Sequence, residues 1–302
     1  MKPALDTVCV RVPGSTSNCG AGFDTLGLAL NLHNDLRVTL VAGARAQAAR
    51  PGDARAQTLV EAAAAAYFAR TGGAPFGFSY QIDGDVPLAR GLGSSVTVYA
   101  GVIAGLAALA GTPMIPHDII TLVTALEGHP DNAAAGVLGG FCVARSDPVS
   151  GAYVGAVRFE VPAELAFVVA SPQVEILTKE SRGALPPALP FFDAVRSINS
   201  AAYLVAAFAA RDYAKLRQAV RDYMHEPYRL PRIAGGRAAI DAGVETGAYT
   251  GWLSGSGSSV LCVCPREQAA GVQAAMSAAF ASAGVKSDVR LLAGENAGLR
   301  LG

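Results

Sequence analysis

The spacing of apolar residues along the first half of the chain predicts alternating strands and helices. Residues 8–12 and 36–41 alternate between apolar and polar positions, as half-buried strands do, and residues 76–82 alternate again. The alanine-rich segment 58–70 predicts a helix, because Thr-Gly-Gly follows it and glycine commonly ends a helix. Residues 96–110 predict a second, longer helix of small side chains. This half therefore mixes strands and helices.

Turn-forming residues interrupt these elements. Residues 13–18, Pro-Gly-Ser-Thr-Ser-Asn, predict a loop after the first strand, and the polar segment 44–57 predicts a surface loop or a weak hairpin. A turn-rich break, Ser-Asp-Pro-Val-Ser-Gly, lies near mid-chain at residues 146–151. Since 302 residues suggest about two domains, we expect an N-terminal domain over residues 1–150 and a C-terminal domain over residues 151–302.

The second half of the chain also mixes strands with helices, and it shows no internal repeat. Strand groups alternate with helices here as they do in the first half. The elements expected are strands within residues 153–170 and at 289–292, a loop and strand at 251–264, and helices at 191–211, 212–224 and 266–283.

Composition and charge exclude several classes of protein. The hydrophobic fraction is 51% and the charged fraction 16%, so the chain can bury a large core, which excludes a disordered chain and a disulfide-stapled miniprotein. Lys plus Arg equals Asp plus Glu, at 24 each, and this zero net charge argues against a nucleic-acid binder.

The cysteines and the apolar stretches indicate a cytoplasmic protein without a membrane segment. The five cysteines are odd in number and lack metal-site spacing, and free thiols fit a reducing compartment. The N-terminal residues contain no apolar signal core. Residues 96–110, the longest apolar stretch, are shorter than the roughly 20 residues that span a bilayer.

A glycine-rich loop before the long helix carries the most chemistry. Residues 87–95 read PLARGLGSS, and their glycines let the backbone approach a ligand closely. The helix that follows presents free N–H groups and a positive dipole end, which suit phosphate. By itself the loop is also consistent with a capped helix after a glycine turn. It is neither a Walker A loop nor a dinucleotide fingerprint.

Four further motifs accompany this loop. Residues 12–27 read VPGSTSNCGAGFDTLG, residues 127–132 read EGHPDN, residues 225–229 read HEPYR, and residues 252–260 read WLSGSGSSV. Together, in this order and spacing, the five motifs resemble those of the GHMP small-molecule kinases, and in detail those of the homoserine kinases. The resemblance covers nearly the whole chain.

The resemblance implies the fold, the cofactors and the nucleotide site. The implied fold is α+β in two domains, an N-terminal ATP-binding α/β domain of a type also found in ribosomal proteins and a ferredoxin-like α+β C-terminal domain. ATP and Mg²⁺ are the implied cofactors, with Ser95 and Glu127 as metal ligands, and a homodimer is plausible. The residues implied to surround the phosphates are Pro87, Arg90, Gly91, Leu92, Gly93, Ser94 and Ser95, with Gly255, Ser256 and Gly257 in the C-terminal glycine motif.

The implied reaction is phosphorylation of the L-homoserine hydroxyl to O-phospho-L-homoserine, a step in threonine biosynthesis. Homoserine is a zwitterion, so its site needs a carboxylate clamp and an ammonium acceptor. Arg182 and Arg229 match the family's carboxylate-binding arginines, and a planar guanidinium suits that role. The other residues that match substrate positions are Asn18, Asp24, His129 and Asn132.

Asn132 leads to a hypothesis about the mechanism. In several GHMP kinases an aspartate that can act as a base stands at this position. An amide cannot remove a proton at neutral pH. We therefore expect the substrate hydroxyl to attack directly, without a protein carboxylate as base, and its proton to pass to phosphate or water.

Other functions remain open at this level. The chain departs from the usual motifs at several small residues, and Thr58 replaces the asparagine that many members carry near the adenine. These changes leave open a GHMP kinase for another small alcohol, such as mevalonate or a sugar. A ligand-sensing homologue without catalysis is disfavoured by the intact glycine loop, and a nucleic-acid binder is disfavoured by the zero net charge.

Overall fold

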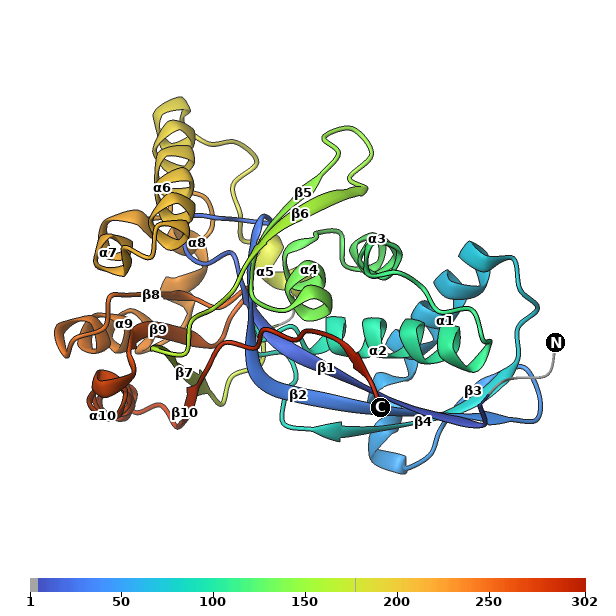
Figure 1. Ribbon diagram of the computed structural model, residues 1–302. Coiled ribbons are helices and arrows are strands. Elements are labelled where there is room, and N and C mark those ends of the chain that lie inside the picture. The colour runs from blue at the N-terminus through green and yellow to red at the C-terminus, as the bar shows by residue number, and fades with distance from the viewer. Residues whose placement is uncertain (1–4, 177) are drawn as a thin grey trace.

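The computed structural model describes residues 5–176 and 178–302. Residues 1–4, which belong to the expected first domain, and residue 177 lie outside this description. Within the described chain the strands form two sheets, one of seven strands and one of four. Figure 1 shows the two sheets at opposite ends of the molecule, each with its own helices.

The long strand β2 is the centre of the first sheet. It pairs antiparallel with β1 on one edge, with β4 over one part of the other edge, and with β5 near its start. The alternating segments that the sequence predicts at 8–12, 36–41 and 76–82 all fall in this sheet. Its strands are β1 (Thr7–Ser17), β2 (Leu26–Val41), β3 (Ala46–Ala48), β4 (Gly77–Gly84), β5 (Phe141–Ser146), β6 (Tyr153–Phe159) and β11 (Arg300–Leu301).

Four helices pack against this sheet and bury its first apolar core. The small side chains of the long helix let it lie close to the strands: Gly101 contacts Leu36, and Gly105 contacts Val38. The core contains side chains from β1, β2 and β4 and from every one of these helices. The helices are α1 (Gln57–Thr71), α2 (Ser94–Leu109), α3 (Pro116–Glu127) and α4 (Asp131–Leu138), and a 3-10 turn, η1 (Pro51–Ala56), precedes α1.

The second sheet has the ferredoxin-like arrangement. Its antiparallel strands lie in the order β10-β7-β9-β8, and α9 and α10 pack against one face through apolar side chains such as Met276 and Phe280. The elements are β7 (Leu165–Pro172), α9 (Gly236–Glu245), β8 (Thr250–Leu253), β9 (Val260–Pro265), η4 (Arg266–Gln268), α10 (Ala269–Ser282) and β10 (Ser287–Leu292).

A shared apolar cluster joins the two sheets. It contains Leu28 of β2 and Phe141 of β5 from the first sheet, and Phe167 of β7 from the second. Phe208 of α6 completes it, with its ring centroid 4.4 Å from that of Phe141. Of the remaining helical segments, α6, η2 and α7 also contribute side chains to this cluster. The remaining segments are α5 (Thr178–Arg182), α6 (Phe191–Ala209), η2 (Tyr213–Lys215), α7 (Leu216–Ala219), α8 (Glu226–Arg229) and η3 (Leu230–Arg232).

The expected domain boundary falls in a hairpin. Residues 146–151 form the turn between β5 and β6, which pair with each other in the first sheet. The strands change sheets only after β6, and residues 300–301 return to the first sheet as β11. We therefore propose that the boundary lies within residues 160–164 and that the end of the chain belongs structurally to the N-terminal domain.

Two local expectations were wrong, because hydrogen bonds of polar side chains determine the backbone conformation in both segments. Residues 13–17 continue β1 as strand, with a register shift between Pro13 and Ser15, because their hydroxyl groups are buried and hydrogen-bonded to distant residues. Residues 212–224 form η2 and α7 but no continuous helix, because the Asp222 carboxylate accepts hydrogen bonds from the next turn of backbone and redirects the chain. The segment at 44–57 contains β3 and η1.

The cysteines lie mostly in the buried interior of the fold. The five cysteines are free thiols in the described chain, and all but Cys9 are buried. Cys262 and Cys264 point into the same apolar core beneath α9 and α10. Among the described residues, no helix is both long and apolar enough to cross a membrane.

Candidate active site

A cavity of about 260 Å³ lies where the two domains meet. The first domain contributes the β1–β2 loop, the start of α2 and the turn before α4, and the second contributes α5, α8 and the segment before β9. The structure thus brings residues from all five motifs into one cavity. The predicted residues that line it are Asn18, Asp24, Gly91, Gly93, Ser94, Ser95, Glu127, His129, Asn132, Arg182, Arg229, Gly255 and Ser256.

Four predicted residues lie behind the cavity wall and shape the loops. The Leu92 side chain is buried in the shared core, and its carbonyl oxygen accepts a hydrogen bond from the Ser15 N–H at 3.1 Å. The Arg90 guanidinium lies 3.7 Å from the Glu175 carboxylate. The Leu92 side chain therefore anchors the glycine loop in the shared core. The predicted residues outside the lining are Pro87, Arg90, Leu92 and Gly257.

The N-terminus of α2 opens into the cavity. Gly93, in the left-handed region with φ of 69°, precedes the helix, and its carbonyl oxygen accepts a hydrogen bond from the Thr97 N–H at 3.2 Å. The N–H groups of Ser94 and Ser95 come before this first helical bond and so have no partner within the helix. Their free donors and the positive end of the helix dipole make this a site for an anion such as phosphate.

The glycines of this loop are required by space as well as by backbone conformation. A methyl group at Gly91, whose φ is 71°, would collide with the carbonyl oxygen of Ser254. A methyl group at Gly93 would come within 2.7 Å of the Ser15 hydroxyl. The glycine loop is therefore pressed between β1 and the segment after β8, and a side chain at Gly91 or Gly93 would force them apart.

The C-terminal glycine motif forms hydrogen bonds between the two domains at the cavity. The Ser254 hydroxyl is buried and contacts both the Thr16 hydroxyl, at 2.9 Å, and the Gly91 carbonyl oxygen, at 2.7 Å. The next residue, Gly255, donates its N–H to the Ser17 carbonyl oxygen at 3.2 Å. One turn of the C-terminal domain thus fixes both the end of β1 and the glycine loop.

Asn132 is fixed by two hydroxyl groups from β1. Its side-chain oxygen accepts a hydrogen bond from Ser15 at 2.8 Å, and its side-chain nitrogen donates to the Ser17 hydroxyl at 2.9 Å. These contacts hold the amide at the cavity wall, and they assign the orientation of its oxygen and nitrogen.

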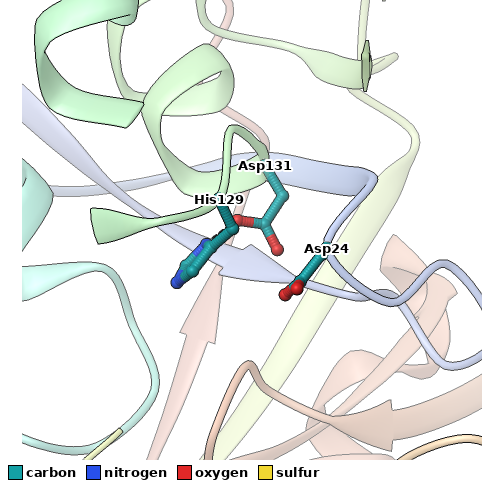
Figure 2. A group of neighbouring side chains, drawn as sticks. All are labelled: Asp24, His129 and Asp131. Atoms are coloured by element: carbon teal, nitrogen blue, oxygen red, sulfur yellow. Dashed lines mark hydrogen bonds and ion pairs between the residues drawn. The ribbon is translucent and has the colours of Figure 1, made fainter. Parts of the chain in front are cut away.

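His129 lies between acidic side chains at the start of α4. Its Nδ1–H donates to Asp131 at 2.5 Å, and Figure 2 shows these two side chains with Asp24 close by. Its Nε2 lies 3.8 Å from the Glu127 carboxylate. Burial lowers the pKa of His129, but the charge and hydrogen bond of Asp131 outweigh burial and raise it to about 9. The second oxygen of Asp131 is buried and has no hydrogen-bond partner among the described residues. The pair is therefore an imidazolium held by a carboxylate.

Two groups of side chains could hold a divalent cation. Asp24, His129 and Asp131 offer ligand atoms within 4.8 Å of one another. In this group, however, Asp24 is paired with an arginine and Asp131 with the histidine. Ser95 and Glu127 offer a hydroxyl and a carboxylate, the oxygen donors that Mg²⁺ prefers, and burial raises the pKa of Glu127. This second pair fits Mg²⁺ better.

Asp24 and Arg182 form an ion pair beside His129 and Asp131 in the cavity. Arg182 Nη2 donates to both carboxylate oxygens of Asp24, at 2.7 and 2.9 Å, and leaves its other N–H groups for a ligand. Asn18 fixes this loop, because its side-chain oxygen accepts the Asp24 N–H at 3.0 Å and its nitrogen donates to the Gly255 carbonyl oxygen at 3.1 Å. Asn18 therefore positions the loop.

Arg229 is a buried cation whose contacts are carbonyl groups. Only 4% of its surface is exposed, and its guanidinium donates weakly to the carbonyl oxygens of Ser181, at 3.3 Å, and Gly255, at 3.5 Å. Among the described residues, no carboxylate lies within ion-pair distance of it. Burial, and next the charge of Arg182, lower the pKa of Arg229 to about 10. An anionic ligand would compensate this cation.

The turn around α8 is hydrogen-bonded to segments that line the cavity. Asp222 accepts hydrogen bonds from the N–H groups of His225 and Glu226, both at 2.7 Å. His225 in turn donates its Nε2–H to the Gly20 carbonyl oxygen at 2.8 Å. Glu226 accepts the Leu253 N–H at 2.6 Å, directly before the C-terminal glycine motif. Burial raises the pKa of Glu226 to about 7.

Sequence reasoning missed one charged cavity residue, Asp131. It lies inside the quoted motif, two residues after His129 and in the first turn of α4. An acidic residue in a first helical turn has an ordinary structural explanation, and nothing local in the sequence distinguishes that from a partner for His129. Ser17, also in the lining, was hidden because its segment was predicted to be a loop.

Comparisons with known proteins agree with this geometry. Models of the N-terminal and C-terminal domains of the GHMP kinases match residues 58–140 and 204–282. The chain is 40% identical over 293 residues to a homoserine kinase of Moorella thermoacetica, covering 96% of this chain and 98% of the relative. It is 34% identical over 287 residues to one of Carboxydothermus hydrogenoformans, covering 93% and 92%. The crystal structure of a homoserine kinase from Cytophaga hutchinsonii superimposes with a TM-score of 0.87 at 27% identity, covering 100% of this chain and 99% of that one.

We expect Gly91→Ala to weaken binding of Mg-ATP by about tenfold or more, because the methyl group displaces the loop from Ser254. Calorimetric titration of the folded variant measures this. Gly72→Ala is the matched control, since Gly72 has a similar φ of 65° but open space around it. Equal losses in the two variants would show that the backbone conformation, and not the Ser254 contact, is responsible.

We expect Glu226→Gln to stabilise the fold more at pH 8 than at pH 5. The pKa of Glu226 is near 7 in the folded state, against an ordinary value of 4.5. The stabilising contribution of its protonated form to the free energy of unfolding is therefore fully present below pH 4.5 and is lost as the pH rises through 7. Gln keeps the acceptor for Leu253 and lacks this loss, so the difference should grow by roughly 2–3 kcal/mol.

Urea unfolding of the parent and of Glu226→Gln at the two pH values measures this difference in free energy. The exposed Glu245→Gln of α9 is the control of equal charge. A difference between parent and Glu226→Gln that is the same at pH 5 and pH 8 would show that the carboxyl group does not titrate in this range.

Proposed function

Since the chain belongs to the GHMP kinases, and within them to the homoserine kinases, we propose that its cavity transfers the γ-phosphoryl group of ATP to the side-chain hydroxyl of L-homoserine. The products are ADP and O-phospho-L-homoserine, which a cell uses for threonine biosynthesis. One observation carries this proposal: an anion site at the start of α2 and two arginines beside a carboxylate line the same cavity.

The two sides of the cavity suit the two substrates. The free amides of Ser94 and Ser95 and the close approach that Gly91 and Gly93 allow suit the phosphates of ATP. A neighbouring cavity of about 200 Å³ shares Leu59 and Leu88 with the first and is lined mainly by apolar side chains. We assign the nucleoside to this second cavity, whose lining includes Leu59, the chain neighbour of Thr58.

The charged residues suit an α-amino acid. Arg182 and Arg229 supply N–H donors for a carboxylate, and the Asp24 carboxylate can accept from an ammonium group. The ammonium and carboxylate groups of an α-amino acid are attached to the same carbon atom. The protein groups that bind them must therefore be adjacent, as Asp24 and Arg182 are. This arrangement favours an amino alcohol with a carboxylate over mevalonate, which has no ammonium group, and over a neutral sugar.

The residues near the hydroxyl would position it and would not deprotonate it. The hydroxyl oxygen forms a bond to the γ-phosphorus, the bond between that phosphorus and the β-phosphate oxygen breaks, and the proton passes to a phosphate oxygen or water. Asn132, held by Ser15 and Ser17, offers an amide where an aspartate could be a base. In a loose transition state for phosphoryl transfer, positioning and electrostatics carry most of the catalysis.

Ser95 and Glu127 are the residues that would hold Mg²⁺. When bound, the ion neutralises charge on the phosphate oxygens. His129, held by Asp131, adds a hydrogen-bond donor on the same side of the cavity. Glu127 remains the metal ligand that the donor chemistry favours, since its carboxylate is buried beside the Ser95 hydroxyl.

The setting in the cell is also part of the proposal. Free thiols in every described cysteine are consistent with a reducing cytoplasm. We keep a homodimer as the expected assembly from the family. Its partner molecules are small substrates, and the zero net charge gives no support for nucleic acid.

Turnover with a panel of alcohols tests the function. A coupled ADP-release assay with Mg-ATP should show selective turnover of L-homoserine over L-serine, L-threonine, mevalonate and galactose. Arg182→Ala and Arg229→Ala should each raise the KM for homoserine by about 10–100-fold, the cost of losing a charged hydrogen bond. The exposed Arg196→Ala of α6 is the control. Turnover of another alcohol alone would show that the enzyme has a different substrate. ATP binding without any turnover would favour a ligand-sensing protein without catalytic activity.

Asn132→Asp tests the absence of a base. We expect kcat to stay level or fall, because the carboxylate can no longer donate to the Ser17 hydroxyl and adds negative charge near the phosphates. Steady-state kinetics with saturating Mg-ATP and homoserine measure it, with the exposed Asn199→Asp as control. A sharp rise in kcat would mean that a carboxylate base can take part in the reaction and would contradict the proposed mechanism.

A further inference from the structure

One aromatic ring meets both of the proposed clamp arginines. Phe23 lies in the β1–β2 loop next to Asp24 and is half-buried. The guanidinium carbon of Arg229 lies 5.1 Å from the centroid of its ring, and that of Arg182 lies 5.5 Å away. Both distances fall inside the roughly 6 Å range in which a ring face attracts a cation. Phe23 is thus the aromatic side chain that links two guanidinium groups from the other domain.

The surrounding structure fixes the position of this ring. The His225 ring stacks on Phe23 at a centroid distance of 5.3 Å, and the His225 Nε2–H donates to Gly20 in the same loop. The Gly22 N–H donates to the Asn18 carbonyl oxygen at 2.8 Å, and a methyl group at Gly22 would collide with Leu26. The loop and α8 therefore hold the ring between them.

The ring also meets an electrostatic need that a carboxylate could not. Burial lowers the pKa of Arg229, and repulsion from Arg182 lowers it further. Arg229 also lacks a carboxylate partner among the described residues. A protein carboxylate at Arg229 would satisfy this cation but would occupy the N–H donors that a ligand carboxylate needs. An aromatic face attracts the cation and leaves those donors free.

We propose that Phe23 is a positioning residue that sets the spacing and direction of Arg182 and Arg229, and so makes the site selective for alcohols that carry a carboxylate. This inference rests on the proposed function, because it takes L-homoserine as the ligand of the two arginines. It adds a specificity determinant that touches the arginines and acts through them.

The test separates the carboxylate from the rest of the ligand. 3-Aminopropanol is homoserine without its carboxylate, and ligand-observed NMR titration gives the Kd of both compounds. We expect Phe23→Leu to raise the Kd for L-homoserine about tenfold and to leave the Kd for 3-aminopropanol within about twofold. Phe23→Tyr, which keeps the ring face, should restore homoserine binding. Phe192→Leu, at an exposed position of α6, is the matched control.

A double-mutant cycle identifies the route of the effect. In an Arg229→Ala background, Phe23→Leu should raise the Kd for homoserine by much less than in the parent, because the ring then has one fewer cation to hold. A merely structural role predicts the full additional loss in that background and an equal loss for 3-aminopropanol. Either result, in variants that melt at the parent temperature, would overturn the proposal.

The failure of the proposed function has a different signature. A parent enzyme that binds L-homoserine more tightly than 3-aminopropanol but does not phosphorylate it would refute the kinase proposal, while the Kd values still decide the role of Phe23. A parent that binds the two compounds equally has no carboxylate clamp, and the proposal for Phe23 then fails.

Discussion

The cleft depends on the buried contact between the Ser254 hydroxyl and the N-terminal domain. This one group contacts Thr16 at the end of β1 and the Gly91 carbonyl oxygen in the glycine loop. The backbone that we propose binds phosphate is thereby held by a residue from the other domain, so the glycine loop keeps a fixed position relative to that domain. The neighbouring glycines are a consequence of this closeness, because side chains at Gly91 would push the two segments apart.

Charge in the cavity is arranged in pairs that leave specific donors free. The imidazole of His129 is held by Asp131, and the neighbouring Arg182 is held by Asp24. Arg229 is compensated by carbonyl groups and by the face of Phe23. Removing water from these charged side chains costs free energy unless a ligand supplies charges of opposite sign next to them, as a zwitterion does. This is a physical reason for selectivity among small alcohols.

Sequence patterns predicted the regular elements and the motifs but not the tertiary contacts of small polar residues. The alternation at 36–41 predicted a strand of β2, and segments of small apolar residues predicted the helices α1 and α2. The ferredoxin-like order of the second sheet followed from the resemblance. Ser15, Thr16 and Ser17 resembled a loop, since their partners Asn132 and Trp252 are more than 100 residues away. Asp131 was missed for the same reason: its importance lies in a neighbour and a burial that local spacing does not reveal. The hairpin at 146–151 has the composition of a linker, and only its pairing shows that it joins two strands of one sheet.

The pairing of β11 with β1 has a consequence for synthesis of the chain. Leu301 lies opposite Val10, and Gly294 forms a bridge with Leu30, so the first sheet is completed by residues 294–301. On the ribosome, β1 emerges early and remains an open edge while nearly 290 residues follow. An unpaired edge is prone to pair with other strands. The nascent first domain therefore depends on late residues for its protection, and shortening the chain near residue 294 would expose that edge in every molecule.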